Sequence, residues 1–343
     1  MLLYLAGDFT GLKTGIDQVT HQGLLAMRHL EPVTVIVHRS TENPTDHDEE
    51  LLEGVQQCLE ENNEIPRLAH IFCGLPIRTM SFLHSLGCKL TYSAVVHDCF
   101  LVQQEAKRLG WKLPLYGGLT CTDLQDRLVV LYALADVVIC PSEQARQTAT
   151  RLGCRAAVVI PFGCELAVVE PLPAPFVVGF LGVPQPDKGL RYLLQAWKEL
   201  DYPDALLLMV GRLMTSPPVR HLVDPYNRRG TVHLAEWIPD VDRFYASISL
   251  YVQPSISEGF GLPVLEAMAH GRVALCSDGA GAVDVVPEAW RFPAGDVDAL
   301  ADKIDQFRKM DLTQLGQKAR AVAENYTWSR IHKQYQNVWR SLL

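Results

Sequence analysis

The sequence predicts an α/β protein with two doubly wound parallel-sheet domains and a final helix. The chain has 343 residues, which corresponds to about two domains of ~150 residues each. In both halves, short apolar segments of strand length alternate with amphipathic segments of helix length. Between the halves, prolines at positions 171, 173 and 175 predict a stiff, extended connector. We therefore expect domains at 1–165 and 166–325, followed by a helix at 326–343 that packs back toward the first domain.

Composition limits the class of protein. Hydrophobic residues make up 48% and charged residues 20%, so each domain can bury a core. The net charge of −8 argues against a nucleic-acid partner. The first residues lack a basic signal-peptide region, and no apolar run approaches the ~20 residues of a membrane span. The nine cysteines are scattered without a Cys-x-x-Cys pair, which is typical of free thiols in a reducing compartment. We expect a cytoplasmic protein.

The first half opens with a strand at 2–6 and continues through a glycine loop into a helix. Gly15 lies where this loop enters the helix, and a glycine there lets the backbone approach a ligand closely. Such loops also occur for packing alone, so this loop does not identify a ligand by itself. The polar, acidic segment at 40–64 is expected to form a loop and a solvated helix without chemistry. Further strands are expected at 33–37, 70–73, 90–96, 135–142 and 157–160.

The strand at 90–96 runs directly into His97. Residues at the carboxyl end of a strand face the crevice of an open α/β sheet, so His97 is a candidate to contact substrate. A hydrogen-bonded structural histidine is the alternative. The segment at 101–119 is basic and aromatic, and could hold an acceptor or contact an anionic membrane surface. We favour a solvated helix face and a loop.

The second half repeats the alternation. A strand at 177–181 is followed by a loop, and Lys188 opens the next helix. A second strand at 206–210 ends in Gly211 and Arg212, and a third precedes Ile238. The remaining elements are expected to be strands at 248–252 and 273–276, and helices at 241–246, 297–307 and 328–342.

The most informative stretch is 257–271. Here an apolar strand meets a glycine turn, Pro263 lies where a helix would start, and Gly271 lies where it would stop. Free backbone N–H groups and the helix dipole make such a turn an anion site. Carboxylates do not bind phosphate, so Glu258 and Glu266 should hold hydroxyl groups on either side of it. The blander interpretation is that Glu266 favours the helix dipole and Glu258 is a surface loop residue. The ligand suggested is a phosphate flanked by sugars.

With these motifs in order, the chain resembles the retaining glycosyltransferases of the GT-B fold, and most closely the family 4 group. The resemblance covers nearly the whole length. Its strongest element is the paired-glutamate motif Ser-x-x-Glu-Gly-Phe-Gly-Leu-Pro-x-Leu-Glu-Ala, which spans Glu258 and Glu266. Supporting motifs are Thr14-Gly15-Ile16, His97-Asp98, Ala135-Asp136, Pro141-Ser142-Glu143, Val159-Ile160-Pro161-x-Gly163, Lys188-Gly189, Val210-Gly211 and Tyr326-Thr327-Trp328.

The resemblance implies a role for each matching residue. Glu266 would accept hydrogen bonds from the donor's ribose hydroxyls, and Glu258 would hold hydroxyls of the transferred sugar. Lys188 would neutralise charge on the departing phosphate, and His97 would contact the sugar near its reacting face. The other donor-binding residues are Gly15, whose backbone would approach the phosphate from the first domain; Gly259, Phe260, Gly261 and Leu262, whose N–H groups would face the sugar and diphosphate; and Arg212 and Ile238, the latter beside the base.

The resemblance also implies a reaction. The domain at 1–165 would bind a hydroxyl-bearing acceptor and the domain at 166–325 the nucleotide-sugar donor, across a central cleft. We expect UDP or GDP as the nucleotide, no cofactor, and a role in polysaccharide biosynthesis. A preorganised lysine and a helix dipole can stabilise a leaving diphosphate without a metal ion, and no Asp-x-Asp signature appears where one would help. No enzymic nucleophile is apparent, so front-face attack assisted by the leaving phosphate is the preferred mechanism. The sequence does not identify the sugar, the acceptor or the oligomeric state.

One position departs from the family pattern. An arginine usually precedes the lysine by five residues, and here that position is Val183. Losing a charge-assisted contact to phosphate costs ~1.5–3 kcal/mol unless another group replaces it. Arg212 or Lys13 could compensate. A sugar-nucleotide-binding protein without transferase activity is therefore the alternative function. A sugar-nucleotide epimerase is a second alternative, although its chemistry does not call for the paired glutamates.

Overall fold

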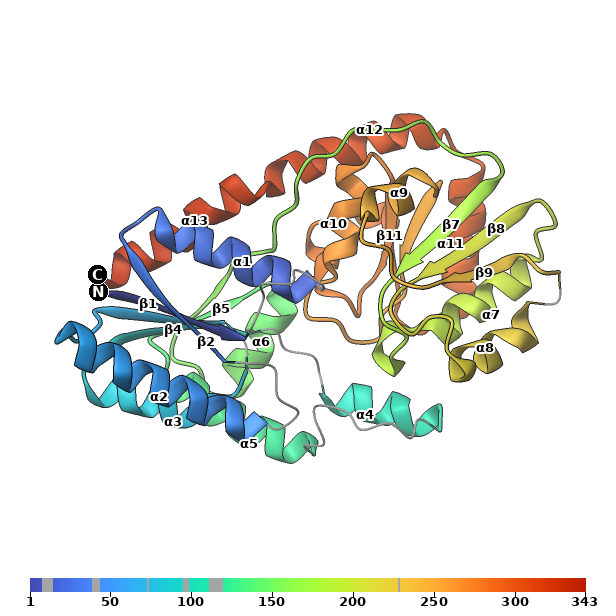
Figure 1. Cartoon of the computed structure of the whole chain (residues 1–343). Coiled ribbons are helices and arrows are strands. Elements are labelled where there is room, and N and C mark those ends of the chain that lie inside the picture. The colour runs from blue at the N-terminus through green and yellow to red at the C-terminus, as the bar shows by residue number, and fades with distance from the viewer. Residues whose placement is uncertain (8–14, 39–43, 73, 95–98, 111–119, 228) are drawn as a thin grey trace. The chain divides into compact units, whose positions relative to one another are not determined.

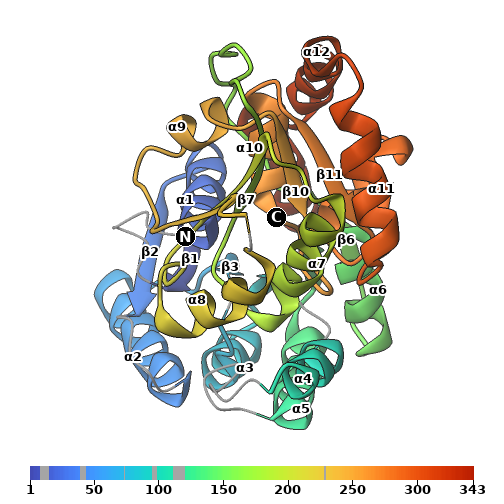
Figure 2. The ribbon, with the colours of Figure 1, turned by 90° about the vertical axis from the view of Figure 1, so that its right-hand side faces the viewer.

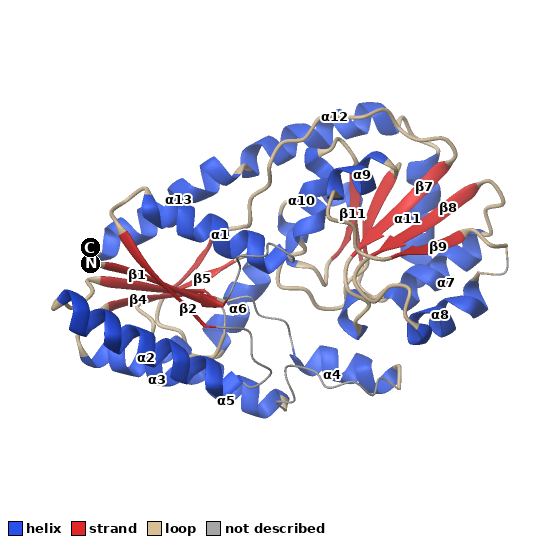
Figure 3. Ribbon diagram, in the orientation of Figure 1, coloured by secondary structure: helices blue, strands red, loops and turns tan. Residues whose placement is uncertain are grey.

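The computed structural model describes residues 1–7, 15–38, 44–72, 74–94, 99–110, 120–227 and 229–343. The chain forms two compact units, each built around its own sheet (Figures 1 and 3). The first unit comprises 1–96, 112–162 and 328–343, and the second comprises 97–111 and 163–327. The α/β class with two parallel sheets is as predicted.

The first sheet has six parallel strands in the order β2-β1-β3-β4-β5-β6. From β1 the chain first adds β2 on one side, and then adds β3 and the later strands on the other side. This change of side makes the sheet doubly wound. Its strands are β1 (Leu2–Gly7), β2 (Val33–His38), β3 (Leu68–Phe72), β4 (Lys89–Ser93), β5 (Val137–Cys140) and β6 (Ala157–Val159), and its helices are α1 (Gly15–Arg28), α2 (Pro44–Asn62), α3 (Ile77–Ser85), α5 (Cys121–Leu134), α6 (Glu143–Arg151) and α13 (Trp328–Leu342).

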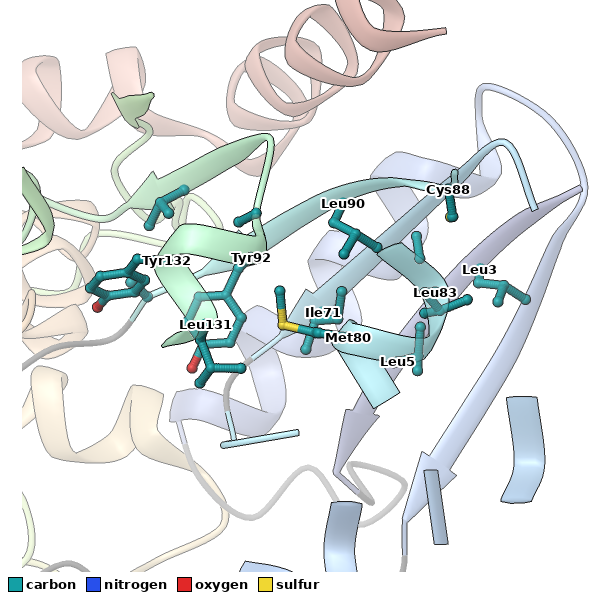
Figure 4. Close-up of a cluster of buried hydrophobic side chains, with 14 of the residues drawn as sticks. Leu3, Leu5, Ile71, Met80, Leu83, Cys88, Leu90, Tyr92, Leu131 and Tyr132 are labelled. Atoms are coloured by element: carbon teal, nitrogen blue, oxygen red, sulfur yellow. The ribbon is translucent and has the colours of Figure 1, made fainter. Parts of the chain in front are cut away.

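The core of the first unit lies between the sheet and the helices that cover one of its faces. Figure 4 shows Met80 and Leu83 of α3 beside Leu3, Leu5 and Ile71 from the central strands. The helix α2, expected to be solvated, buries Leu51, Val55 and Cys58 in the same cluster. The sequence prediction of this helix was therefore incomplete, because its apolar residues are sparse among many acids and only one narrow face is buried.

The final helix belongs to the first unit, where α13 packs against α1. Trp339 is fully buried, and its indole nitrogen donates a hydrogen bond of 3.1 Å to Thr91 Oγ1 of β4. The structure divides the chain after residues 162 and 327, compared with predicted boundaries after 165 and 325.

One segment lies in a different unit from the one expected. Residues 99–110 fall within the predicted first domain, but they group with the second unit, where α4 (Cys99–Arg108) packs on the short helix η2 (Pro186–Lys188). The Tyr192 hydroxyl donates to Glu105 Oε2 at 3.0 Å and accepts from Arg108 at 2.9 Å. These side chains face a residue more than 80 positions away, so the local pattern of 101–119 did not indicate where the helix would dock.

The second sheet also has six parallel strands, in the order β12-β11-β10-β7-β8-β9. From β7 the chain crosses to β8 on one side, and from β10 it crosses to β11 on the other side. Helices cover both faces of the sheet, with α7 packed beside α11 and α10 packed beside α12 (Figure 2). The strands are β7 (Phe176–Leu181), β8 (Ala205–Val210), β9 (Val232–Ala235), β10 (Leu250–Gln253), β11 (Val273–Ser277) and β12 (Arg291–Phe292), and the helices are α7 (Leu190–Leu200), α8 (Pro217–Val223), α9 (Val241–Ala246), α10 (Leu262–Ala269), α11 (Val297–Arg308) and α12 (Leu312–Ala323).

Two further features bear on the sequence predictions. Among the described helices, none combines the length and apolar character needed to cross a bilayer. The eight cysteines that the structure describes are all free thiols, and seven of them are buried.

Candidate active site of the second unit

The second sheet has a topological switch point between β7 and β10. The two strands are hydrogen-bonded neighbours, and the chain leaves their carboxyl ends in opposite directions. In open α/β sheets the loops at such a point diverge and leave a crevice in which ligands bind. The loop after β7 carries Lys188, and the loop after β10 carries Glu258. The fold thus brings together two residues that the sequence motifs had singled out separately.

Two glycines give these loops their conformation. Gly189 has φ +68°, and a Cβ there would lie 1.9 Å from the backbone oxygen of Pro254, just beyond the end of β10. Only glycine allows the loop after β7 to lie this close to the end of β10. Gly261 has φ +95° and forms the N-cap of α10. The left-handed turn at Gly261 ends the loop that follows Glu258 and starts the helix immediately behind it.

Lys188 lies between two carboxylates. Its ammonium is hydrogen-bonded to Glu258 Oε2 and lies 3.1 Å from Asp187 Oδ2. The side chains of Lys188 and Glu258 are each 15% exposed, and Asp187 is buried. Burial acts to lower the pKa of Lys188, but the charges of Glu258 and Asp187 outweigh it and raise that pKa above its ordinary value. Lys188 therefore remains a cation in a largely desolvated site.

The helix α10 begins directly behind this cluster. Its first residues are Leu262 and Pro263. Proline suits the start of a helix, because the N–H that it lacks would have no partner within the helix. The Phe260 side chain is 1% exposed and its carbonyl accepts from Ala282 at 2.6 Å, and Leu262 is also buried. Anything that these two residues offer to a ligand therefore comes from the backbone, as expected for Gly259–Leu262, and the start of α10 supplies the positive end of a helix dipole.

Glu266 lies one turn into α10 and is half-buried. Its Oε2 accepts a hydrogen bond of 2.7 Å from the Tyr245 hydroxyl, which comes from α9. Burial raises the pKa of Glu266, and the hydrogen bond from Tyr245 partly opposes that shift. The two glutamates thus lie in different surroundings: Glu258 is paired with a lysine, and Glu266 with a phenol.

Arg212 and Ile238 occupy neighbouring loops at the same edge of the sheet. Arg212 follows β8 and is exposed, and Ile238 follows β9 and is half-buried. Glu236 joins these loops, because its carboxylate accepts from the backbone N–H groups of Leu213 at 3.1 Å and Thr215 at 3.0 Å. The Thr215 hydroxyl also donates to this carboxylate and contributes most to lowering the pKa of Glu236, and the two backbone hydrogen bonds add to the shift. Arg212 and Ile238, two predicted donor-binding residues, therefore lie on loops that are tied together.

A buried chain of polar groups supports the carboxyl end of β10. The Tyr251 hydroxyl donates to Gln253 Oε1 at 2.6 Å, and Gln253 Nε2 donates to Ser255 Oγ at 2.8 Å. The Ser277 hydroxyl donates to the Ser255 carbonyl at 2.6 Å. Satisfied networks of this kind rigidify a site. Sequence reasoning did not identify these residues, and it also missed Asp187 beside Lys188.

Two predicted site residues receive no geometry here. His97 lies outside the described residues. Gly15 is the first residue of α1 in the first unit, and its surroundings also lie outside the described residues. At the departure from the family pattern, Val183 is half-buried and its carbonyl accepts from Gln185 at 2.9 Å. An aliphatic side chain at this position supplies no charge, so a second phosphate-binding cation would have to come from another loop.

Two doubly wound parallel-sheet domains define the class of this protein as α/β with the GT-B fold. Solved structures of that class match it over its whole length: sucrose-phosphate synthase from Thermosynechococcus elongatus has a TM-score of 0.77 at 20% identity and covers 100% of this chain and 99% of its own. Anabaena Alr3699/HepE in complex with UDP-glucose has a TM-score of 0.75 at 17% identity, with 99% of both chains covered. At these identities the likeness shows the fold.

Sequence comparisons point to the same class of protein. Residues 175–309 match the family model described as "Glycosyl transferases group 1". The chain is 32% identical over 174 residues to O-antigen chain mannosyltransferase B of Escherichia coli, covering 48% of this chain and 45% of the relative. It is 27% identical over 175 residues to the capsular polysaccharide biosynthesis glycosyltransferase CapM of Staphylococcus aureus, covering 49% and 44%. The chain thus spans about half the length of these relatives in the matches.

Proposed function

We propose that this protein is a retaining glycosyltransferase that moves a sugar from a nucleotide-diphosphate sugar to a hydroxyl group of an acceptor. The observation that carries the proposal is the placement of Lys188 between Glu258 and Asp187 at the switch point, directly before the start of α10. A cation and a helix N-terminus attract a diphosphate, while a carboxylate beside them attracts hydroxyl groups. The match of residues 175–309 to the group 1 glycosyl transferases supports the same activity.

Each residue has a definite task in this reaction. Lys188 and the N–H groups at the start of α10 bind the diphosphate and stabilise the charge that grows on it. Glu258 accepts hydrogen bonds from the sugar, and Glu266 accepts them from the ribose. The bond between the anomeric carbon and the phosphate oxygen breaks, and a bond from that carbon to the acceptor oxygen forms on the same face. The acceptor proton passes to the leaving phosphate oxygen, so the product retains the donor's configuration.

The pairing of Lys188 with Glu258 fits this sequence of events. Without ligand, the two charges neutralise each other in a site that is largely shielded from water. When a donor binds, the diphosphate takes the place of Glu258 at Lys188, and the sugar hydroxyls take the place of Lys188 at Glu258. Asp187 stays beside Lys188 and keeps the ammonium in position during this exchange. No metal ion is needed to balance the diphosphate in this scheme.

UDP and a hexose find support among the structural neighbours and relatives, and GDP stays a prediction from the sequence. One structural neighbour was determined with UDP-glucose, and one sequence relative is named as a mannosyltransferase. Two relatives are named for O-antigen and capsular polysaccharide synthesis, and we propose that the acceptor is a glycan or a lipid-linked glycan. Contact of the 100–120 segment with a membrane surface stays a prediction.

A binding protein without transferase activity is the competing function, and Val183 is the observation that favours it. A panel of UDP- and GDP-hexoses, with release of nucleoside diphosphate as the readout, separates the candidates. A transferase slowly hydrolyses its donor even without acceptor, and does so equally in EDTA if no metal takes part. Tight binding without release favours the binding protein, and interconversion of the donor sugar favours an epimerase.

A further inference from the structure

The two oxygens of the Glu266 carboxylate are in different situations. Oε2 accepts the hydrogen bond of 2.7 Å from the Tyr245 hydroxyl. Oε1 accepts no hydrogen bond from any residue in the described part of the chain. A carboxylate with one oxygen fixed has its plane fixed, so the remaining oxygen presents its lone pairs in one set of directions. The open oxygen is therefore oriented before any ligand arrives.

Tyr245 is itself held by burial and by two neighbouring residues. Its side chain is fully buried, and its carbonyl accepts from Nε of the buried Arg272 at 2.8 Å. Its ring lies 4.6 Å from the ring of His270, centroid to centroid. His270 in turn contacts the Glu266 carbonyl through Nδ1 at 2.6 Å and Asp242 Oδ1 through Nε2 at 3.0 Å. The phenol cannot swing away from Glu266 without disrupting these contacts.

Packing alone does not account for the hydroxyl group of Tyr245. The other acceptor near it is the Pro263 carbonyl at 3.4 Å, which is long for an O–H···O hydrogen bond. A phenylalanine would fill the same space within the aromatic group that Tyr245 forms with Phe244, Tyr251 and His270. The hydroxyl is thus directed at Glu266, where a hydrogen bond to an ionised group is stronger than one to a neutral group.

We infer that Tyr245 is a positioning residue that fixes Glu266 for the two ribose hydroxyls, and that this contact sets the preference of the site for ribonucleotides over deoxyribonucleotides. The inference rests on the proposed function, because it assigns Glu266 to the ribose. Tyr245 touches no substrate and acts only through the Glu266 carboxylate. Its loss should therefore weaken the recognition of the ribose hydroxyls and leave the phosphate contacts at Lys188 unchanged.

The test compares nucleotides that differ only in those hydroxyls. Calorimetric titration measures Kd for UDP and GDP and for their 2′,3′-dideoxy forms, with wild type and Tyr245→Phe. Wild type should bind the better ribonucleotide at least about tenfold more tightly than its dideoxy form, which is the effect of losing a hydrogen bond to a charged group. In Tyr245→Phe most of that ratio should disappear, through weaker binding of the ribonucleotide, while Kd for the dideoxy form stays within about twofold.

Tyr202→Phe is the matched control. The Tyr202 hydroxyl also donates to a carboxylate, that of Asp305, at 2.7 Å. Tyr202 follows the C-terminal end of α7 and Asp305 lies in α11, so this pair is away from the site, which lies at the N-terminal end of α7. Its removal should leave both Kd values unchanged. If Tyr245→Phe folds and keeps the wild-type ratio, the inference is wrong and the proposed function stands. If both dissociation constants rise equally, Tyr245 has only a structural role, which also overturns the inference. If wild type binds none of the four nucleotides, the proposed function and the inference fail together.

Discussion

The ammonium of Lys188 is paired with the carboxylate of Glu258, which lies 70 positions later in the chain. The pair joins the loops that follow β7 and β10, and Asp187 is the second carboxylate beside the same ammonium. A cation shared by two carboxylates in a desolvated site depends on both of them, and both carboxylates depend on it. This dependence makes the cluster testable by stability as well as by activity.

Replacing Lys188 by methionine should destabilise the protein strongly, because it leaves Glu258 and Asp187 close together without a counter-charge. We expect a loss of roughly 3 kcal/mol in the free energy of unfolding, measured by denaturant titration. Adding Glu258→Gln should restore part of that loss. The exposed pair of Lys309 and Asp305 is the control, and Lys309→Met should cost less than about 1 kcal/mol. Additive effects of Lys188→Met and Glu258→Gln would contradict the coupling.

Replacing Gly189 by alanine should destabilise the second unit and abolish activity. The added methyl group would lie 1.9 Å from the Pro254 carbonyl oxygen, at a φ of +68°. The backbone would have to move, at a cost of at least about 2 kcal/mol, and Lys188 would move with it. Gly230 has φ +72° and open space around its Cα. Gly230→Ala therefore carries only the conformational cost, and should retain activity; equal effects at the two positions would refute the explanation.

Glu266 should link nucleotide binding to pH. Burial raises its pKa, so a fraction of the carboxylate is protonated at mildly acidic pH, where an ordinary glutamate is still ionised. A protonated carboxyl accepts hydrogen bonds from the ribose poorly, so affinity should fall as pH decreases toward the ordinary glutamate range. Glu266→Gln should bind nucleotide more weakly than wild type, and its affinity should not show this fall as pH decreases. Titrations of both proteins over the same pH series make the comparison, and parallel curves would show that Glu266 is not the responsive group.

The same pKa direction predicts an effect on stability. A carboxyl group whose pKa is raised by folding favours the folded state when protonated, and that contribution is lost as pH rises through the folded-state pKa. At neutral pH the ionised Glu266 is therefore a cost to stability. Glu266→Gln should have a Tm at least as high as wild type at neutral pH, even though it binds nucleotide less well. A clearly lower Tm would mean that the charge itself holds the fold together.

Arg212 should supply part of the phosphate affinity that Val183 does not. It is exposed in the loop after β8, beside the switch-point strand β7. Arg212→Ala should raise Kd for nucleoside diphosphates about tenfold, as expected for loss of a charge-assisted hydrogen bond. Arg243 of α9 is an exposed arginine paired with Asp240, the residue before that helix, and Arg243→Ala should leave Kd unchanged. Equal Kd values for Arg212→Ala and wild type would exclude this compensation.

The sequence was a good guide wherever local pattern decides structure. The apolar strands, the glycine turn and Pro263 predict the β10-loop-α10 unit directly, with Glu258 in its loop and Glu266 in its helix. Side-chain partners separated along the chain were not predictable. Tyr245 reaches Glu266 across 21 positions, and Tyr192 holds α4 through Glu105 across 87. Nothing in the spacing of these residues indicates that they meet, because the packing of whole helices brings them together.

Donor turnover is the most direct measurement of the central claim. UDP- and GDP-hexoses are incubated with wild type, Lys188→Ala and Glu258→Gln, and release of nucleoside diphosphate is followed with and without glycan acceptors. The account predicts release from at least one donor by wild type, and a decrease of at least about tenfold in each variant, equivalent to ~1.4 kcal/mol of barrier. Failure of wild type to release nucleotide from any donor, or near-wild-type rates in both variants, would contradict it.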